Sequence, residues 1–469
     1  MIIPQSHAPG PAGAKPLSRT SAPVRFAFVG TGGRVRTFLD PVPARFPAEA
    51  AIVGLCDASI VRARFHQKRL RERFGYGEVP VYQAADFGRM LRETRPDVVV
   101  VCTVDCEHDR YIIEALRAGC DAVTEKPMTT TAAKCAAILR AAGESERAVR
   151  VCFNYRWIPG ATKVREILRD GVIGKVRHVT LEYLLNTSHG ADYFRRWHSE
   201  KHNSGGLLVH KSTHHFDLVN WWIDAIPSEV FAHGALQFYG RENAIRRGDE
   251  AFTRYPRYYG QGPMSADPFA YDYSRSMIQD IPYEKAIYLG EAEKETGYVR
   301  DRNVFRNGID IEDTMNVLVR YRDGTLLNYS LNAFSPYEGF RVAFNGDRGR
   351  VEYREFHGAH LAPDAGIGQE HAHAGRSELR VFPHFKPSYS VEVPVIHGAH
   401  GGSDDLLQEQ IFSSTPPVDP FQRAAGPEQG AASILIGIAA NESIATGKPV
   451  SVSSLVPLRP DAIRLGELR

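Results

Sequence analysis

The amino-acid sequence predicts an α/β protein that begins with a doubly wound parallel sheet and continues into a second domain. Three observations support this prediction. The chain has 469 residues, more than a single small core accommodates. Apolar strands alternate with helical stretches in units of about 30 residues through the N-terminal third. One strand, residues 96–103, is nearly all apolar, which is typical of a parallel strand covered on both faces.

Composition and charge narrow the class of protein. The chain is 43% hydrophobic and 24% charged, as expected of a globular protein, and its formal net charge is +2. This balance gives no electrostatic footprint for nucleic acid or an acidic membrane, and no apolar run reaches the roughly 18 residues of a spanning helix. The six cysteines lie in the first third, mostly in apolar runs, as reduced cytosolic thiols do. We therefore expect a cytoplasmic protein with neither nucleic acid nor membrane as a partner.

The chain divides into three parts. Residues 1–23, rich in Pro, Ala and Ser without the apolar core of a signal peptide, are expected to be a flexible arm. Residues 24–150 form the first domain and residues 151–469 the second. Within the second, residues 236–310 are long for a connection and rich in Tyr and Arg, so we expect a functional insertion. A C-terminal helix is predicted at about residues 429–446.

A glycine-rich turn follows the first strand. The strand 24–30 ends at Gly30-Thr31-Gly32 and the chain then turns toward a helical pattern, so backbone N–H groups there can cradle a pyrophosphate. Val35 occupies the third glycine position of such a motif, which is a departure from it. The pattern nevertheless favours dinucleotide binding over a purely structural turn.

An aspartate closes the second strand. Asp57 is suited to accept hydrogen bonds from the adenosine ribose hydroxyls and to repel a 2′-phosphate. NAD is therefore favoured over NADP, although Arg62 and Arg64 lie close by and keep NADP open. Asp57 could also cap the following helix.

A cluster of basic side chains precedes an apolar helical run at residues 204–222. His210, Lys211, His214 and His215 fall within six positions. Because burying an unpaired charge is costly, such a cluster is a solvated helix start, a metal site or an acid–base centre.

A lysine follows a further strand. The segment 124–128, Thr-Glu-Lys-Pro-Met, places Glu125 and Lys126 at the carboxyl end of a strand, where ligands bind in open α/β sheets. Lys126 there is suited to act on a substrate hydroxyl, whereas the ordinary alternative is a surface lysine.

These motifs together resemble the Gfo/Idh/MocA oxidoreductases. The glycine-rich turn, the Glu-Lys-Pro segment, residues 151–179 and residues 204–217 carry the resemblance, which runs from about residue 24 to 350. It implies a Rossmann domain followed by an α/β domain with a large, open, mainly antiparallel sheet that often mediates oligomerisation. A homodimer or homotetramer is then expected. Members of the family oxidise or reduce sugars, cyclitols and their derivatives with a nicotinamide cofactor.

The resemblance assigns roles to particular residues. Lys126 matches the family's active-site lysine, and His214 matches its histidine. His210 stands where the family usually has an aspartate, and Ser212 replaces a glycine. Either His210 takes the role of that aspartate or another carboxylate, such as Glu125, does. The residues expected to bind the cofactor are Gly30, Thr31, Gly32, Gly33, Arg34, Asp57, Thr103, His108, Glu125 and Lys126.

The histidine motif suggests how the chemistry runs. If the following run is helical, His210, His214 and Asp217 share one face, so that Asp217 could fix the tautomer of His214. Thr213 is the candidate N-cap, and His215 is expected to be structural. We expect His214 to remove the hydroxyl proton while Lys126 stabilises the developing alkoxide. The expected catalytic residues are Lys126, His214 and His210.

Aromatic and cationic residues interleave at 192–203, as in a loop that stacks on a sugar ring, although Trp197 could equally plug the core. The residues expected to contact substrate are Tyr155, Arg156, Arg195, Trp197, His198 and Lys211. No metal is expected. A two-histidine ligand pair of His210 and His214, completed by Asp217 or His108, is the weaker alternative.

Three functions remain open at this point. The first is an NAD-dependent oxidoreductase acting on a sugar, cyclitol or glycoside. The second is a glycoside-cleaving enzyme whose tightly bound NAD is reduced and restored within one cycle. The third is a non-catalytic sugar or nucleotide sensor, against which the retention of Lys126 and His214 argues.

Overall fold

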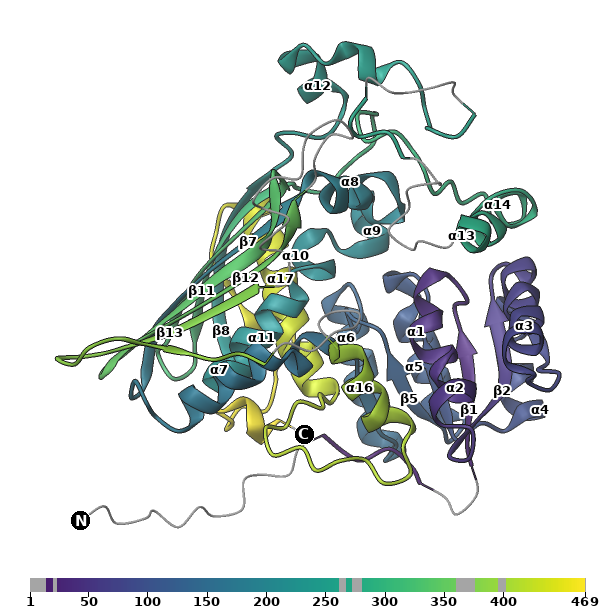
Figure 1. Cartoon of the computed structure of the whole chain (residues 1–469), viewed down its shortest axis with the longest axis horizontal. Coiled ribbons are helices and arrows are strands. Elements are labelled where there is room, and N and C mark those ends of the chain that lie inside the picture. Colours follow the sequence, from purple (N-terminus) through teal and green to yellow (C-terminus); the bar gives the residue numbers. More distant parts are fainter. Residues whose placement is uncertain are drawn as a thin grey trace.

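The computed structural model of the chain shows two domains lying side by side, one built on each of two sheets (Figure 1). The structure describes residues 14–19, 23–260, 267–271, 281–359, 376–394 and 402–468.

The first sheet is parallel and six-stranded, in the order β3-β2-β1-β4-β5-β6, which confirms the predicted doubly wound domain. The chain order changes between β1 and β4, so their carboxyl ends form the crevice where such sheets bind ligands. Its strands are β1 (Val24–Val29), β2 (Ala50–Asp57), β3 (Val81–Gln83), β4 (Val98–Val101), β5 (Asp121–Thr124) and β6 (Val149–Val151). The main helices between them are α3 (Ile60–Phe74), α4 (Phe87–Thr94), α5 (His108–Arg117) and α6 (Ala132–Ser145).

The second sheet has nine strands in the order β14-β13-β12-β11-β7-β10-β9-β8-β15. Strands β7 and β10 are parallel and the other pairs antiparallel, so the sheet is mixed but mainly antiparallel, as expected. The strands are β7 (Val176–Asn186), β8 (Pro227–Ala235), β9 (Thr314–Tyr321), β10 (Leu326–Ser335), β11 (Tyr337–Gly346), β12 (Gly349–Ala359), β13 (Arg376–Pro383), β14 (Tyr389–Val391) and β15 (Val450–Ser451).

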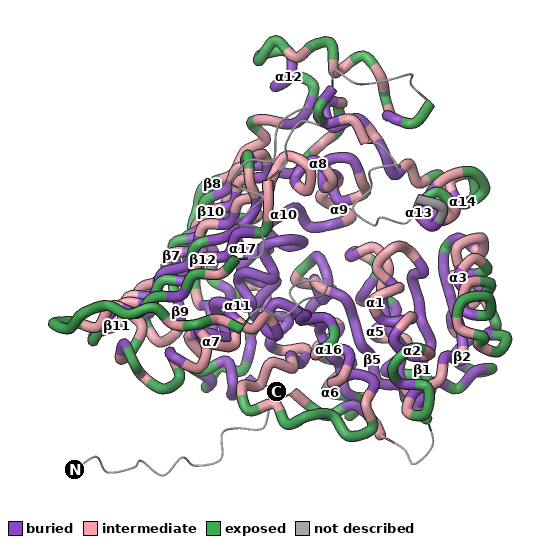
Figure 2. The backbone as a smooth tube through the Cα atoms, viewed as in Figure 1, coloured by how far each residue is buried: buried purple, intermediate pink, exposed green. Residues whose placement is uncertain are grey.

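One face of this sheet is covered by helices α7 (Pro159–Arg169), α11 (Thr213–Ile223) and α17 (Pro427–Thr446), which lie between it and the first domain (Figures 1 and 2). Along β9 and β10, buried residues alternate with exposed ones, as in a sheet with one open face. Helix α17 confirms the predicted C-terminal helix and ends at Gly447, whose φ is +68°.

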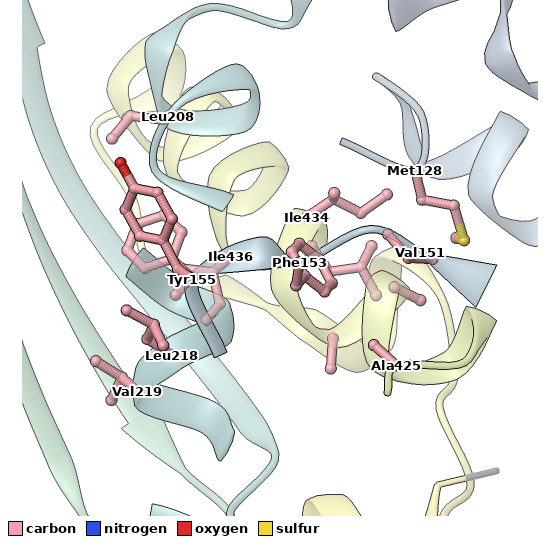
Figure 3. Packing of buried hydrophobic residues seen from close by; sticks show 14 of the residues in the cluster. Met128, Val151, Phe153, Tyr155, Leu208, Leu218, Val219, Ala425, Ile434 and Ile436 are labelled. Atoms are coloured by element: carbon pink, nitrogen blue, oxygen red, sulfur yellow. The ribbon is translucent and has the colours of Figure 1, made fainter. Parts of the chain in front are cut away.

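One apolar core joins the two domains (Figure 3). Phe153 and Tyr155 follow β6 and pack with Ile434 and Ile436 of α17, while Met128 and Val151 extend the cluster into the first domain. The residues after β6 therefore enter the second domain already fixed in the core, which positions the ring of Tyr155.

Two segments outside residues 24–150 pack on the first domain. Helix α16 (Ser403–Phe412) belongs to the second domain by sequence, but the ring of Phe412 packs on Phe26 of β1 with centroids 4.9 Å apart. Within the expected flexible arm, Leu17 is buried and the Ser18 amide donates to Asp121 at 2.6 Å, so residues 14–19 dock on the chain's own first domain. The rest of the arm, residues 1–13 and 20–22, lies outside the described residues.

The expected insertion contains α12 (Arg241–Arg247), α13 (Ile281–Tyr288) and α14 (Glu291–Thr296). Residues 261–266 and 272–280 of it lie outside the described part of the chain. Among the described helices, none combines the length and apolar character needed to span a membrane.

Candidate functional site

The glycine-rich turn has a backbone that only glycine fits. Gly30 has φ +84°, and a Cβ there would lie 2.5 Å from the carbonyl carbon of Cys102. Its amide donates to the carbonyl of Cys56 at 2.9 Å, which holds the turn against β2. Further along the turn, the Gly33 amide donates to the hydroxyl of Tyr288 at 2.8 Å. The Gly33 N–H is the kind of group that a dinucleotide pyrophosphate engages at such a turn, and here Tyr288 accepts from it.

Asp57 ends β2, as predicted, and fixes this turn. One of its carboxylate oxygens accepts from the amide and hydroxyl of Thr31, at 2.5 and 3.0 Å. The other accepts from the Ser59 amide at 2.7 Å. Ser59, and not Asp57, caps helix α3 through its side chain.

Arg34 and Glu125 form an ion pair at 2.6 Å, and Arg34 also reaches Asp404 of α16 at 3.4 Å. Glu125 lies beside Lys126 in the chain, but its carboxylate is engaged by Arg34. This corrects the suggestion that Glu125 replaces the missing family aspartate.

His108 is almost fully buried at the start of α5. Its Nδ1 lies 2.8 Å from the Pro127 carbonyl and its Nε2 3.2 Å from the Thr103 carbonyl. Burial lowers the pKa of His108, and the neutral ring has one N–H, which it donates to one of these two carbonyls. The ring is thus held against the backbone, and its contact with the cofactor stays a prediction. Thr103 stays at the carboxyl end of β4, where its role remains a prediction.

Asp105, His210 and Lys126, which come from both domains, form a row of contacts at the edge of the first sheet. We call this row the Asp105–His210–Lys126 line. Lys126 Nζ lies 3.3 Å from His210 Nε2 and donates to the His210 carbonyl at 3.2 Å. His210 Nδ1 lies 2.5 Å from an oxygen of Asp105. The geometry holds a proton between Nδ1 and Asp105, leaving Nε2 to accept from the Lys126 ammonium.

Asp105 is the carboxylate beside His210 that sequence reasoning missed. It lies in the short turn η3 (Asp105–Glu107) just after β4, next to β5, whose carboxyl end leads to Lys126. An acidic residue at the carboxyl end of the neighbouring strand was the signal available.

Burial sets the protonation of this line. Burial lowers the pKa of Lys126 to about 8, against the opposing attraction of Asp105 and Glu125. Burial, reinforced by the charge of Lys126, lowers the pKa of His210 well below its usual range. The line therefore contains a neutral imidazole and an ammonium that can lose its proton near physiological pH.

His214 belongs to a second group of side chains, which also includes Tyr155, Lys211, Tyr183 and Glu338. Its ring stacks on Tyr155 with centroids 4.2 Å apart. Lys211 Nζ donates to the Tyr155 hydroxyl at 3.2 Å and is only 4% exposed, which removes the solvated alternative. The Tyr183 hydroxyl, 3.5 Å from that of Tyr155, donates to Glu338 at 3.2 Å. Tyr183 and Glu338 come from β7 and β11, and no sequence motif connected them to the histidines.

Asp217 does not serve His214. Its two oxygens accept from Arg156 at 2.6 and 2.7 Å, and Arg156 also donates to Gln429 at 2.9 Å. Arg156 is 0% exposed, so the pair belongs to the core. Two predictions were wrong for this reason: Asp217 does not set the tautomer of His214, and Arg156 is not placed to contact substrate. The N-cap of α11 is also Ser212, not Thr213.

The aromatic loop contributes two rings. The ring of Trp197 stacks on that of His198 with centroids 3.6 Å apart. The His198 ring meets the His210 ring edge-on, with centroids 4.3 Å apart. These rings wall the site beside His210, and their contact with substrate stays a prediction. Arg195 instead donates to the Phe269 carbonyl and faces the ring of Tyr258 in the insertion, which corrects its expected role.

His215 is almost fully buried. Its ring stacks on that of Tyr183 with centroids 3.9 Å apart, and its Nδ1 lies 2.8 Å from the Tyr329 hydroxyl.

Within the described residues, no three His, Cys, Asp or Glu side chains gather as a metal site would need.

Comparison with known proteins agrees with this geometry. The NAD-binding Rossmann fold of the GFO_IDH_MocA oxidoreductase family matches residues 24–153, and that family's C-terminal alpha/beta domain matches residues 165–452. YteT of Bacillus subtilis (strain 168), which is named as an oxidoreductase, is 37% identical over 432 residues, covering 90% of this chain and 96% of YteT. D-glucoside 3-dehydrogenase of Escherichia coli (strain K12) is 27% identical over 201 residues, 42% of this chain and 53% of that enzyme.

Among solved structures, the aldose-aldose oxidoreductase from Caulobacter crescentus aligns with a TM-score of 0.58 and 18% identity. The alignment covers 92% of this chain and 99% of that one, and it shows a shared fold. The family matches together cover most of the chain, beyond the stretch that carried the resemblance. The chain belongs to the Gfo/Idh/MocA oxidoreductases and is an enzyme of that class.

Proposed function

We propose that this enzyme transfers hydride between NAD and a hydroxyl-bearing carbon of a sugar, cyclitol or glycoside. The observation that carries the proposal is the line Asp105–His210–Lys126, which ends beside the crevice of an NAD-binding domain. A buried ammonium there can donate to a substrate oxygen, and the name of the D-glucoside dehydrogenase relative supports a carbohydrate.

The turn that begins at Gly30 would hold the pyrophosphate of the dinucleotide, and Asp57 would lie at its ribose end. When bound, the nicotinamide supplies the hydride acceptor for oxidation and the donor for reduction. NAD is favoured over NADP because a carboxylate lies at the end of β2.

The residues of the second domain handle the proton. His214 takes the proton of the substrate hydroxyl in oxidation and returns it in reduction. Lys126 donates a hydrogen bond to the same oxygen and stabilises its developing negative charge. His210 holds the Lys126 ammonium in place, and Asp105 holds His210 in the tautomer that accepts. Asp105 and His210 are thus positioning residues.

The exposed face of the large sheet carries Leu318 and Leu326 among its outward residues. We expect it to pair with a second copy in a cytoplasmic homodimer or homotetramer, which light scattering would measure.

One experiment separates the open functions. The purified enzyme is mixed with NAD⁺ and a panel of sugars, cyclitols and aryl glycosides, and NADH absorbance and aglycone release are followed in the same sample. Accumulating NADH without aglycone supports the proposal. Aglycone release without net NADH supports cleavage by a transiently reduced cofactor. Binding of sugars with neither signal would contradict the assignment of Lys126 and His214 to catalysis.

A further inference from the structure

The insertion reaches across to the first domain and packs on the dinucleotide crevice. Residues 283–298, the α13–α14 segment, lie against α3 in a separate small apolar cluster (Figure 1). Its buried members are Tyr283, Ile287 and Tyr288, packed against Phe65 and Tyr298. This cluster is separate from the two main cores, so the segment is held to α3 and the glycine-rich turn by its own contacts.

The hydroxyl of Tyr288 is hydrogen-bonded to the glycine-rich turn. It accepts the hydrogen bond of the Gly33 amide at 2.8 Å, and it lies 3.4 Å from where a Cβ of Gly32 would be. The amides of this turn are the groups that a pyrophosphate would engage. One N–H cannot donate fully to both oxygens, so the Tyr288 hydroxyl and a bound dinucleotide compete for it.

Glu295 places a second carboxylate near Asp57, at the end of the site where the adenosine ribose is proposed to bind. It accepts from the Ser59 hydroxyl at 2.5 Å and lies 3.3 Å from the Val61 amide, two and four residues beyond Asp57. A 2′-phosphate entering here would meet the charges of both Glu295 and Asp57.

The guanidinium of Arg62 is already engaged and is not directed at the position of an incoming 2′-phosphate. Its Nε donates to the Ile287 carbonyl at 2.8 Å, and its two terminal nitrogens face Thr296 at 3.4 Å and Asp57 at 3.5 Å. All three nitrogens of the guanidinium are therefore directed at the α13–α14 segment or at Asp57.

We propose that the α13–α14 segment is the outer wall of the dinucleotide site and sets both the affinity and the choice of dinucleotide. Tyr288 must release the Gly33 amide before a pyrophosphate binds, and Glu295 joins Asp57 in rejecting a 2′-phosphate. The inference rests on the proposed use of NAD, but it concerns residues that come from the second domain.

The first test is Tyr288→Phe in the full chain, with NAD⁺ binding measured by calorimetry and its association rate by stopped-flow fluorescence. Removing the competing hydroxyl should lower the Kd for NAD⁺ by about three- to tenfold, the size of one net hydrogen bond, with faster association. Tyr259→Phe, at an exposed tyrosine of the same insertion, is the matched control and should leave both quantities unchanged. Unchanged or weaker NAD⁺ binding in Tyr288→Phe would overturn the competition.

The second test is Glu295→Gln, with NADP⁺ and NAD⁺ titrated in parallel. NADP⁺ binding should tighten about five- to tenfold relative to NAD⁺, since one negative charge is removed near the 2′-phosphate. Glu291→Gln on the same helix, whose carboxylate pairs with Lys294, is the control. An unchanged ratio of the two Kd values would overturn the role of Glu295. A wild-type enzyme that bound neither dinucleotide would instead overturn the proposed function together with this inference.

Discussion

The carboxyl edge of the first sheet and the corner between α10 (Leu207–His210) and α11 meet at the site, yet they are assembled differently. At the sheet edge, polar residues such as Asp57 follow buried strands and bind backbone close by. At the corner, His210 takes its carboxylate from the other domain, 105 residues away in the chain. Asp217, three residues from His214, is used by the core instead. Sheet topology therefore predicts partners at the edge, whereas helical spacing misassigns them at the corner.

The largest expected effect comes from removing the two residues that we propose to contact the reacting oxygen. Lys126→Ala and His214→Ala should each lower kcat by about 10²–10⁴-fold, because both act as charge develops on that oxygen. NAD⁺ affinity should change little, since neither side chain holds the glycine-rich turn. Steady-state kinetics and NAD⁺ titration measure the two quantities. Turnover near that of the wild type in both variants would remove the proposed mechanism.

Asp217 and Asp105 are both buried, but we expect the first to affect stability and the second to affect kcat. Arg156→Met leaves the Asp217 charge unpaired in the core and should lower the free energy of unfolding by about 3–5 kcal/mol. Asp105→Asn should cost far less stability, because its amide oxygen still accepts from His210, yet it should reduce kcat. Denaturant unfolding measures the first and kinetics the second. The double variant Arg156→Met/Asp217→Leu should recover most of the lost stability, and failure to do so would contradict a role confined to packing.

His210→Asp introduces the aspartate that is usual in the family and tests the middle residue of the Asp105–His210–Lys126 line. His210→Asp alone would set two carboxylates against each other beside Lys126, so we expect kcat to fall at least about tenfold. Adding Asp105→Asn relieves that repulsion and leaves one carboxylate for the lysine, so part of the activity should return. A single variant as active as the double variant would show that Asp105 does not act through His210.

The pH dependence should report Lys126 directly. Burial lowers the pKa of Lys126 to about 8, so the ammonium form is lost as pH rises through that value. Since the proposed mechanism uses the ammonium, kcat/KM should fall about tenfold per pH unit above pH 8. Lys126→Arg keeps its charge and should lack this limb, although its activity is lower. A rise in kcat/KM through pH 8 would instead assign the proton abstraction to neutral Lys126.

The sequence predicted the regular parts of this molecule and not the contacts between them. The glycine-rich turn, Asp57, Lys126 and the doubly wound sheet each follow from local patterns whose physics is confined to one strand and its loop. The partners of Asp105 and Tyr288 could not be assigned in this way. Each reaches its partner only because two segments far apart in the chain pack together, at separations of 105 and 255 residues.

The smallest expected effect is that of His215→Gln, one position from the proposed base. His215 stacks on Tyr183 and bonds the Tyr329 hydroxyl in the core, so its loss should lower the free energy of unfolding by about 1–2 kcal/mol. Its kcat should stay within about twofold of the wild type, because the ring is engaged away from the reacting oxygen. His214→Gln is the matched comparison and should reverse the pattern, with a large loss of kcat and little loss of stability. If His215→Gln reduced kcat more than His214→Gln, the base would be His215, and the stack of His214 on Tyr155 would be the structural one.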